Sequence, residues 1–357
     1  MAERRPLEPY VGGSSPPPPA QFSPVRSRLF PCQREAARHT AAVAGFRIAA
    51  RYSYAYLDVA TNRPVTTTTP ERVTRPIGPG SLLWRYAGDH RLAFSGLSAG
   101  LLQLMHPAIG AGVVEHSDFF RDPWGRIIRS IPQILGVVYL PDPETLGRRI
   151  KGYHRSIRGM DAAGRSYRAL EPSTFWWAHA TFQYSVEMVA DRFDHRRLSA
   201  AGREELYLDG VEWYRRYGVS MSAVPADRAT FAAEWDRHVD EVLEMTPAAA
   251  KAVDMALHDR HMELKFLPTW TRALQPAVIT PLLRLGAFGG LPAQLRRRLG
   301  IPWGLREEAD YRFLRYSVAS LWRWLPAQAR YGPVASAGYA ARVRRDSHGH
   351  QALLSEA

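Results

Sequence analysis

Two histidines stand where helical spacing would place an imidazole against apolar side chains. His154 follows Ile150 by four residues and precedes Ile157 by three, and His179 follows Trp176 by three. A neutral imidazole that a helix presents to an apolar pocket can ligate haem iron. A lone core histidine more commonly bonds a backbone carbonyl, so both interpretations stay open on the residues alone.

A haem site would also need cations, because haem carries two propionates. His106 directly precedes Pro107, where a helix can begin, and it joins His179 as a reserve candidate for a ligand or a polar group of the pocket. The candidate partners of the propionates are Arg126, Arg129, Arg149, Lys151, Arg155 and Arg158.

Other catalytic motifs have weaker support. The stretch GLSAG at 96–100 matches the G-x-S-x-G turn of serine hydrolases, with Ser98 as the nucleophile. That turn follows a strand in a fold of alternating strands and helices, which this sequence does not indicate. Its small residues favour the close approach of two helices instead. The chain has no H-E-x-x-H motif and no pair of Glu-x-x-His motifs, so zinc proteases and the usual di-iron bundles lack their ligands.

Composition indicates a folded chain with an excess of arginine. Of its 357 residues 46% are hydrophobic and 11% aromatic, enough to close a core. Lys and Arg number 47 against 34 Asp and Glu, which gives a formal net charge of +13. Residues 1–28 are rich in Pro and Ser and are predicted to be a disordered tail. We expect a single all-helical domain over 29–345 and a flexible C-terminal tail over 346–357.

Helical signals dominate after about residue 80. Asp142 and Pro143 supply an N-cap and a proline at the first helical position, and Pro172 opens another helix. Residues 46–59 could form a strand or a helix. Together these patterns predict an all-α, multi-helix globular fold. Further helices are predicted at about 202–217, 226–245, 248–262, 271–287 and 307–324.

The segment 92–114 contains no acidic or basic residue over 23 positions and therefore reaches the length of a membrane span. It also contains four glycines and the pair His106-Pro107, which predicts two helices with a break between them inside a protein core. The N-terminus has no apolar stretch typical of an export signal, and Cys32 is the only cysteine. We therefore expect a cytoplasmic, reducing location.

Four segments, in order along the chain, resemble the MpaB-type oxygenase family, whose relatives include the latex-clearing rubber oxygenases. The resemblance runs from about residue 78 to 193 and more weakly to about 303. The segments are SLLWRYAGDHRLAFSG (81–96), LLQLMHPAIGAGVVEHSDFFRDPWGRIIRS (101–130), LGRRIKGYHRSIRG (146–159) and WWAHATFQYS (176–185).

The resemblance implies an all-α fold that holds b-type haem through one histidine and uses dioxygen to oxidise or cleave an apolar, often isoprenoid, substrate. The family's haem histidine aligns with His154. Arg126 and Ser130 keep the spacing of an arginine and a threonine associated with that site, with serine in place of threonine. Lys151 stands where the family has an arginine, and Arg129 stands where it has a lysine that can cap the iron.

The resemblance also implies a glutamate base, for which Glu115 is the nearest residue, about five positions from the aligned place. We therefore expect His154 as the metal ligand, and Arg126, Ser130 and Glu115 as catalytic residues. The expected cofactor contacts also include Lys151. We expect Tyr153, Trp176 and Phe182 to form an apolar wall of the site.

The predicted function is therefore that of a haem b-dependent oxygenase acting on an isoprenoid- or lipid-like substrate. The alternative is a non-catalytic helical protein that binds an apolar ligand or an anionic membrane surface, with residues 277–295 as an interfacial helix. Binding of nucleic acid is not expected, because the arginines are dispersed rather than clustered with stacking aromatic residues.

Overall fold

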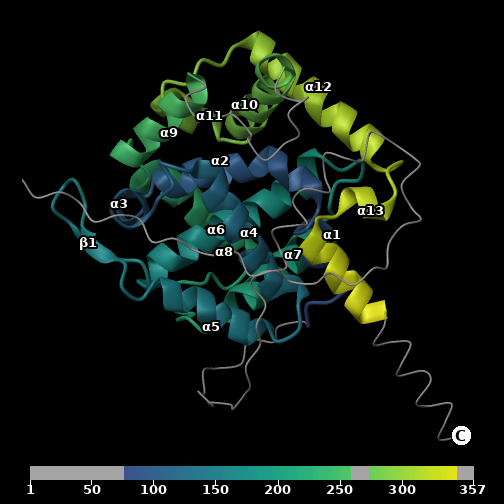
Figure 1. Ribbon diagram of the computed structural model, residues 1–357, viewed down its shortest axis with the longest axis horizontal. Helices are drawn as coiled ribbons and strands as arrows, with labels where there is room; N and C mark the ends of the chain where they lie inside the picture. The colour runs from purple at the N-terminus through teal and green to yellow at the C-terminus, as the bar shows by residue number, and fades with distance from the viewer. Residues whose placement is uncertain (1–75, 259–272, 344–357) are drawn as a thin grey trace, which may run out of the picture. The chain divides into compact units, whose positions relative to one another are not determined.

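The computed structural model describes residues 76–258 and 273–343, and these residues are mostly helical (Figure 1). The predicted all-α fold is confirmed. The predicted boundaries near 28 and 345 and the segment 46–59 lie outside the described residues. The α-helices are α1 (Leu82–Tyr86), α2 (Ala93–Leu104), α3 (Pro107–His116), α4 (Pro123–Tyr139), α5 (Pro143–Tyr153), α6 (Pro172–Arg192), α7 (Ala200–Arg215), α8 (Arg228–Arg237), α9 (Pro247–Leu257), α10 (Thr280–Gly289), α11 (Ala293–Arg298), α12 (Leu305–Trp322) and α13 (Ala327–Arg330).

Shorter turns of other helical types join these elements. A 3₁₀ turn, η4 (His90–Leu92), leads into α2. The π-helical turns η5 (His238–Val242) and η7 (Gln275–Ile279) continue α8 and precede α10. The predicted helix at 226–245 is therefore α8 followed by η5, and the one at 271–287 corresponds to η7 and α10. The end of the predicted helix 248–262 lies outside the described residues.

Helix α6 is the centre of the core. Pro172 occupies its first turn, as predicted, because the amide that proline lacks would have no partner there. Buried side chains occur on all sides of this helix, among them Trp176, Trp177 and Val189. A helix that is apolar all round must be covered on every side. Helices α1, α2, α3 and α7 pack against it (Figure 1).

The predicted break at His106-Pro107 separates α2 from α3. The two helical stretches, His90–Leu104 and Pro107–His116, meet at 96°. No single helix in the described part of the chain is both long and apolar enough to cross a membrane, and this bent pair meets the criteria by length and composition only.

Helix α2 also packs closely on α10, as its small residues suggested, but other glycines make the approach possible. Gly96 and Gly100 have open space where a Cβ would stand. A Cβ at Gly286 would lie 2.8 Å from the carbonyl oxygen of Phe94, and one at Gly290 would overlap Ser98. The glycines of α10, rather than those of the G-x-S-x-G motif, therefore allow the contact.

Helix α5 begins as predicted at Asp142-Pro143. Asp142 has a φ of 56°, and its carboxylate accepts a hydrogen bond of 3.4 Å from the Thr145 amide. Helix α5 packs along α4, and Gly147 lets it approach the end of α7, because a side chain there would overlap the carbonyl of Arg216. These contacts fix the position of the residue that ends α5, which is His154.

A short hairpin follows α5, and the sequence did not predict it. Strand β1 (Arg158–Met160) pairs with β2 (Ser166–Arg168) in antiparallel register, with Gly159 opposite Tyr167. Asp161 closes the turn by accepting hydrogen bonds from the Ala163 and Arg165 amides at 2.9 and 2.8 Å. Strands of three residues are too short to show alternation, but an Asp with a Gly three residues later is a turn signal.

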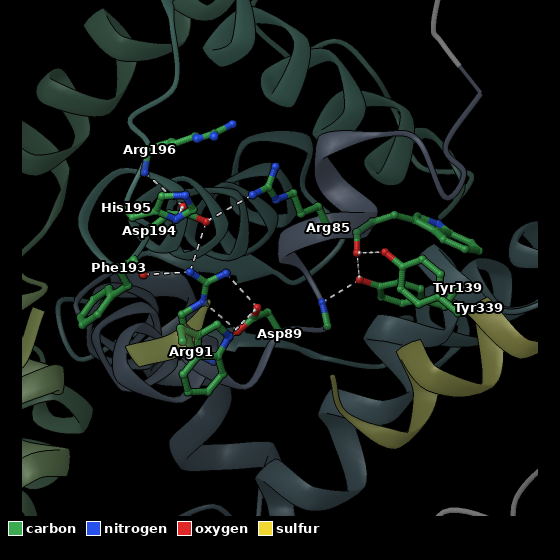
Figure 2. A network of polar contacts seen from close by, with 12 residues as sticks. Arg85, Asp89, Arg91, Tyr139, Phe193, Asp194, His195, Arg196 and Tyr339 are labelled. Carbon is green, nitrogen blue, oxygen red and sulfur yellow. Dashed lines mark hydrogen bonds and ion pairs between the residues drawn. The ribbon is translucent and has the colours of Figure 1, made fainter. Parts of the chain in front are cut away.

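A buried network of charges joins the start of the helical domain to later elements (Figure 2). Arg91 bonds both carboxylate oxygens of Asp89, at 3.0 and 2.8 Å. It also reaches Asp194 at 3.2 Å and the carbonyl of Phe193 at 2.8 Å. Trp322 of α12 donates to Asp89 at 3.1 Å. The network therefore connects η4, the end of α6 and α12.

Candidate functional site

His154 ends helix α5 and turns its ring towards the core. Its Nδ1 lies 2.8 Å from the carbonyl oxygen of Ile150, one turn earlier in the helix. If Nδ1 carries the proton, this bond leaves Nε2 as the free lone pair, which is the arrangement that metal-bound histidines commonly adopt. No residue in the described ranges hydrogen-bonds Nε2 of His154. The imidazole can therefore act as a ligand from the end of α5.

The surroundings of His154 keep the ring neutral. Burial lowers its pKa, and the nearby charge of Arg126 lowers it further, against the opposing effect of the Ile150 carbonyl. Its ring lies edge-on to Phe175 of α6, with centroids 5.4 Å apart. Phe175, rather than the expected Trp176 or Phe182, is the aromatic residue in contact. The expected Tyr153 is 56% exposed.

Arg126 and Ser130 lie on α4, one turn apart. Burial lowers the pKa of Arg126, although a guanidinium remains charged. The Ser130 hydroxyl donates to the carbonyl oxygen of Arg126 at 2.8 Å. Its proton is therefore engaged within the helix, and its oxygen keeps only the ability to accept. The structure thus places the charge of Arg126 near His154, whereas Ser130 makes no direct contact with His154.

Helix α4 carries half-buried apolar side chains along its length, with Ile131 at the boundary of exposure at 36%. Helix α4 also carries Arg126 and packs along α5, which ends at His154, so apolar side chains, a guanidinium and a neutral imidazole lie on two neighbouring helices. This combination suits a large apolar group that carries anionic substituents. The other half-buried apolar residues are Trp124, Ile127, Ile128, Ile134 and Leu135.

Two other cations of this region, Lys151 and Arg129, have protein partners. Lys151 donates from Nζ to the carbonyl oxygen of Gly218, beyond the end of α7. Arg129 pairs with Asp118 and, at 3.4 Å, with Asp122 on the surface. A guanidinium held by two carboxylates is not an iron ligand, so Arg129 makes surface ion pairs instead.

His179 lies in the core instead of lining a surface. Its Nε2 lies 2.9 Å from the carbonyl oxygen of Gly210, and its Nδ1 is buried without a partner in the described part of the chain. Burial lowers its pKa to about 3. Aromatic rings surround it within 6 Å, namely Trp176, Trp213, Tyr214 and Tyr217.

His106 occupies a different buried position, at the N-cap of α3. Burial lowers its pKa to about 4, with further lowering by His238 and Arg165. His238 stacks on Trp177, with centroids 4.8 Å apart and planes at 3°. The two reserve histidines therefore lie in separate parts of the core, and no contact in the described residues joins either to His154.

Glu115, the expected base, ends up at the hairpin. Its carboxylate accepts a hydrogen bond of 2.6 Å from the Tyr167 hydroxyl. Burial and then this contact raise the pKa of Tyr167 to about 12. Among the described residues no contact connects Glu115 with Arg126 or Ser130, so the structure does not assemble these three into one catalytic cluster.

The serine hydrolase interpretation fails on geometry. Ser98 is fully buried inside α2, and its hydroxyl donates to the carbonyl oxygen of Ala287 at 2.9 Å. A nucleophile must be exposed on a turn with a base beside it. Ser98 instead binds α2 to α10.

Asp254 and His258, which together with His261 could share one face of a helix, lie on α9 and at its C-cap, and their side chains lie on the surface. His258 pairs with Asp254 at 2.8 Å and is half exposed. Within residues 76–258 and 273–343, no group of three or more His, Cys, Asp or Glu side chains is placed to hold a metal ion. His261 lies outside the described residues.

The proposed interfacial segment at 277–295 turns much of its apolar surface inwards. Phe288, Leu291 and Leu295 are buried in the core, while Val278 and Leu282 are 48% and 37% exposed. The segment does not present a continuous apolar face to solvent, which removes the observation that favoured a membrane contact there.

Two cavities lie away from His154. One, of about 10 Å³, lies between α6 and α8 and is lined by Trp177, Trp235 and His238 among others. The other, of about 80 Å³, lies beside the network of Arg91. The signal for this second site in the sequence was the D-H-R triplet at 89–91 with the D-R-F-D stretch at 191–194, whose proximity depends on the fold.

Comparison with known proteins identifies a family over most of this helical domain. Residues 84–320 match the model described as "ER-bound oxygenase mpaB/B'/Rubber oxygenase, catalytic domain". No curated protein and no solved structure gives a significant match. The matched region includes α2 to α11 and most of α12, and therefore His154, Arg126 and the core around α6. The chain belongs to the family of mpaB-type and rubber oxygenase catalytic domains.

Proposed function

We propose that the protein is a haem b-dependent oxygenase that uses dioxygen to oxidise or cleave an apolar, isoprenoid- or lipid-like substrate. The observation that carries the proposal is the environment of His154. Its Nδ1 bonds the Ile150 carbonyl, Nε2 is free, and Arg126 lies close enough to lower the pKa of the ring. Membership of an oxygenase family supports the reaction class.

The chemistry of these donors fits a haem. Nε2 of His154 would hold the iron of the family's haem, and that group would supply the redox chemistry with dioxygen. Burial holds the imidazole neutral in the folded state, so its lone pair needs no deprotonation before it binds. The bond to Ile150 fixes the plane of the ring. This histidine therefore needs little rearrangement to serve as a ligand.

Arg126 supplies a fixed positive charge beside that ligand. A guanidinium forms paired hydrogen bonds with a carboxylate, so Arg126 suits a propionate or another anionic group of the bound molecule. Ser130 stabilises the backbone turn that carries Arg126, because its hydroxyl donates to that residue's carbonyl. Serine can make this bond as threonine does, so its role in this chain is to position Arg126.

The half-buried apolar surface of α4 would exclude water and contact the apolar substrate. Ile127, Ile128 and Ile131 offer no hydrogen-bonding groups, so this surface recognises shape and apolar area only. Oxygen uptake with a polyisoprenoid and with a fatty acid would separate the two substrate types.

An absorption spectrum tests the ligand assignment. We expect a Soret band in the full-length protein expressed with sufficient iron and haem precursor, and we expect His154→Ala to lose the haem or shift the band. His258→Ala is the matched control, because its Nδ1 also bonds the carbonyl four residues earlier, at 3.0 Å, but on an exposed surface. A protein that remains colourless after reconstitution with hemin, or an unchanged spectrum in His154→Ala, would contradict the proposal.

A further inference from the structure

The larger of the two cavities lies between elements that are far apart in the sequence. Its volume is about 80 Å³, several times the roughly 10–15 Å³ that one ordered water needs. Its lining includes Arg85 of α1, Arg323 at the end of α12 and Arg330 of α13. Asp194 and His195 line it from the chain that follows α6. The cavity therefore has room for a small polyatomic ion.

Carboxylates do not balance the arginines of this pocket. Four arginines line it, together with two aspartates, so the lining carries an excess of two positive charges (4 − 2) when His195 is neutral. Arg91 occupies both oxygens of Asp89 and also bonds Asp194 (Figure 2). The two carboxylates are satisfied by Arg91 together with the indole of Trp322 and the backbone amide of Arg196.

The other arginines keep donors available. Nε of Arg330 is buried and has no hydrogen-bond partner in the described ranges. No carboxylate of the described residues pairs with Arg323 or Arg330. Arg85 reaches Asp194 only at 3.7 Å, and its side chain is 51% exposed. A buried guanidinium donor without a partner costs free energy, and an anion in the cavity would remove that cost.

We infer that this pocket binds a phosphate group, either as inorganic phosphate or as a phosphomonoester. The excess of two positive charges matches a phosphate dianion. Donors from α1, from the end of α12 and from α13 approach from separate elements, which suits a tetrahedral group with several acceptor oxygens. A carboxylate would be satisfied by a single guanidinium fork. The inference does not depend on haem.

Titration calorimetry of the full-length protein with inorganic phosphate at low ionic strength tests this site. We expect binding to the wild type, and about tenfold or greater weakening in Arg330→Gln, because each charge-assisted bond contributes about 1.5–3 kcal/mol. Arg323→Gln is expected to weaken binding to a smaller extent, and because Arg323 is exposed the substitution should leave the fold intact. Arg312→Gln is the control, because Arg312 pairs with Glu308 on α12 and does not line the pocket.

A second arm identifies the source of the phosphate. Cosedimentation with phosphatidic acid vesicles, lost in Arg330→Gln and Arg323→Gln, would assign the site to a lipid headgroup that carries a phosphomonoester. Absence of vesicle binding together with binding of inorganic phosphate would assign it to a soluble ligand. No phosphate binding to the wild type, or equal binding by the wild type and both pocket variants, would overturn the inference.

Discussion

Burial keeps His179 and His106 neutral in the folded protein, with pKa values of about 3 and about 4. In the unfolded chain both would take up a proton near pH 6.5. The unfolded state therefore binds more protons between these values, and stability falls as the pH drops through that window. Each histidine should lower the free energy of unfolding by about 2 kcal/mol between pH 7 and pH 5, since each pKa unit corresponds to about 1.4 kcal/mol.

Urea unfolding of His179→Gln at the two pH values measures this effect. Between pH 7 and pH 5 the free energy of unfolding should fall by about 2 kcal/mol less in the variant than in the wild type, whatever the variant's absolute stability. An identical pH dependence in His179→Gln and the wild type would show that His179 is not the source of the acid sensitivity.

Single residues show where sequence reasoning reaches its limit. His154, His238 and His258 all bond the carbonyl four residues earlier, so their local geometry is the same. They differ in what other elements bring to them: Arg126 and Phe175 to His154, Trp177 to His238, and solvent to His258. Helical spacing predicts the bond to the carbonyl four residues earlier. It cannot predict which side chains from other elements surround the ring.

At the scale of elements, prolines and caps made the helix starts predictable. Pro107, Pro143 and Pro172 each stand in the first turn of a helix, where the missing amide costs nothing. The glycine contacts were not predictable in the same way. Gly96 and Gly100 resemble a packing motif but face open space, while Gly286 contacts helix α2. Which face of a helix meets its neighbour depends on how the helix is rotated, and the packing of the whole core sets that rotation.

Two glycines on α5 give opposite predictions for the same substitution. Gly147→Ala should destabilise the protein by about 1–3 kcal/mol, because the new methyl group would overlap the Arg216 carbonyl and backbone atoms yield little. Gly152→Ala meets nothing within 4 Å and should stabilise by about 0.5–1 kcal/mol, through the lower entropy of the unfolded chain. Chemical denaturation at pH 7 measures both, and equal effects of the two substitutions would contradict the close contact between α5 and the end of α7.

At the scale of the molecule, the charge network around Arg91 joins residues more than 100 positions apart. Asp194 is 103 residues from Arg91, and Trp322 is 233 residues from Asp89. The sequence contains these residues without any local sign that they meet. Composition and helical periodicity could therefore predict the fold class, while the arrangement of the helices around this network depended on long-range packing.

Removing Arg91 tests how much this network contributes to the whole domain. Arg91→Ala leaves Asp89 and Asp194 buried without their main partner and should cost about 3–5 kcal/mol of unfolding free energy. Arg129→Ala also removes an arginine with two carboxylate partners, but that side chain is 49% exposed, so the cost should be about 0–1 kcal/mol. Trp322→Phe removes the hydrogen bond to Asp89 but keeps an aromatic ring against Arg91, and it should cost about 1 kcal/mol while the fold is retained. Equilibrium denaturation of all three variants ranks these costs. If Arg91→Ala were no more destabilising than Arg129→Ala, the buried pairs would not be what holds η4, the end of α6 and α12 together.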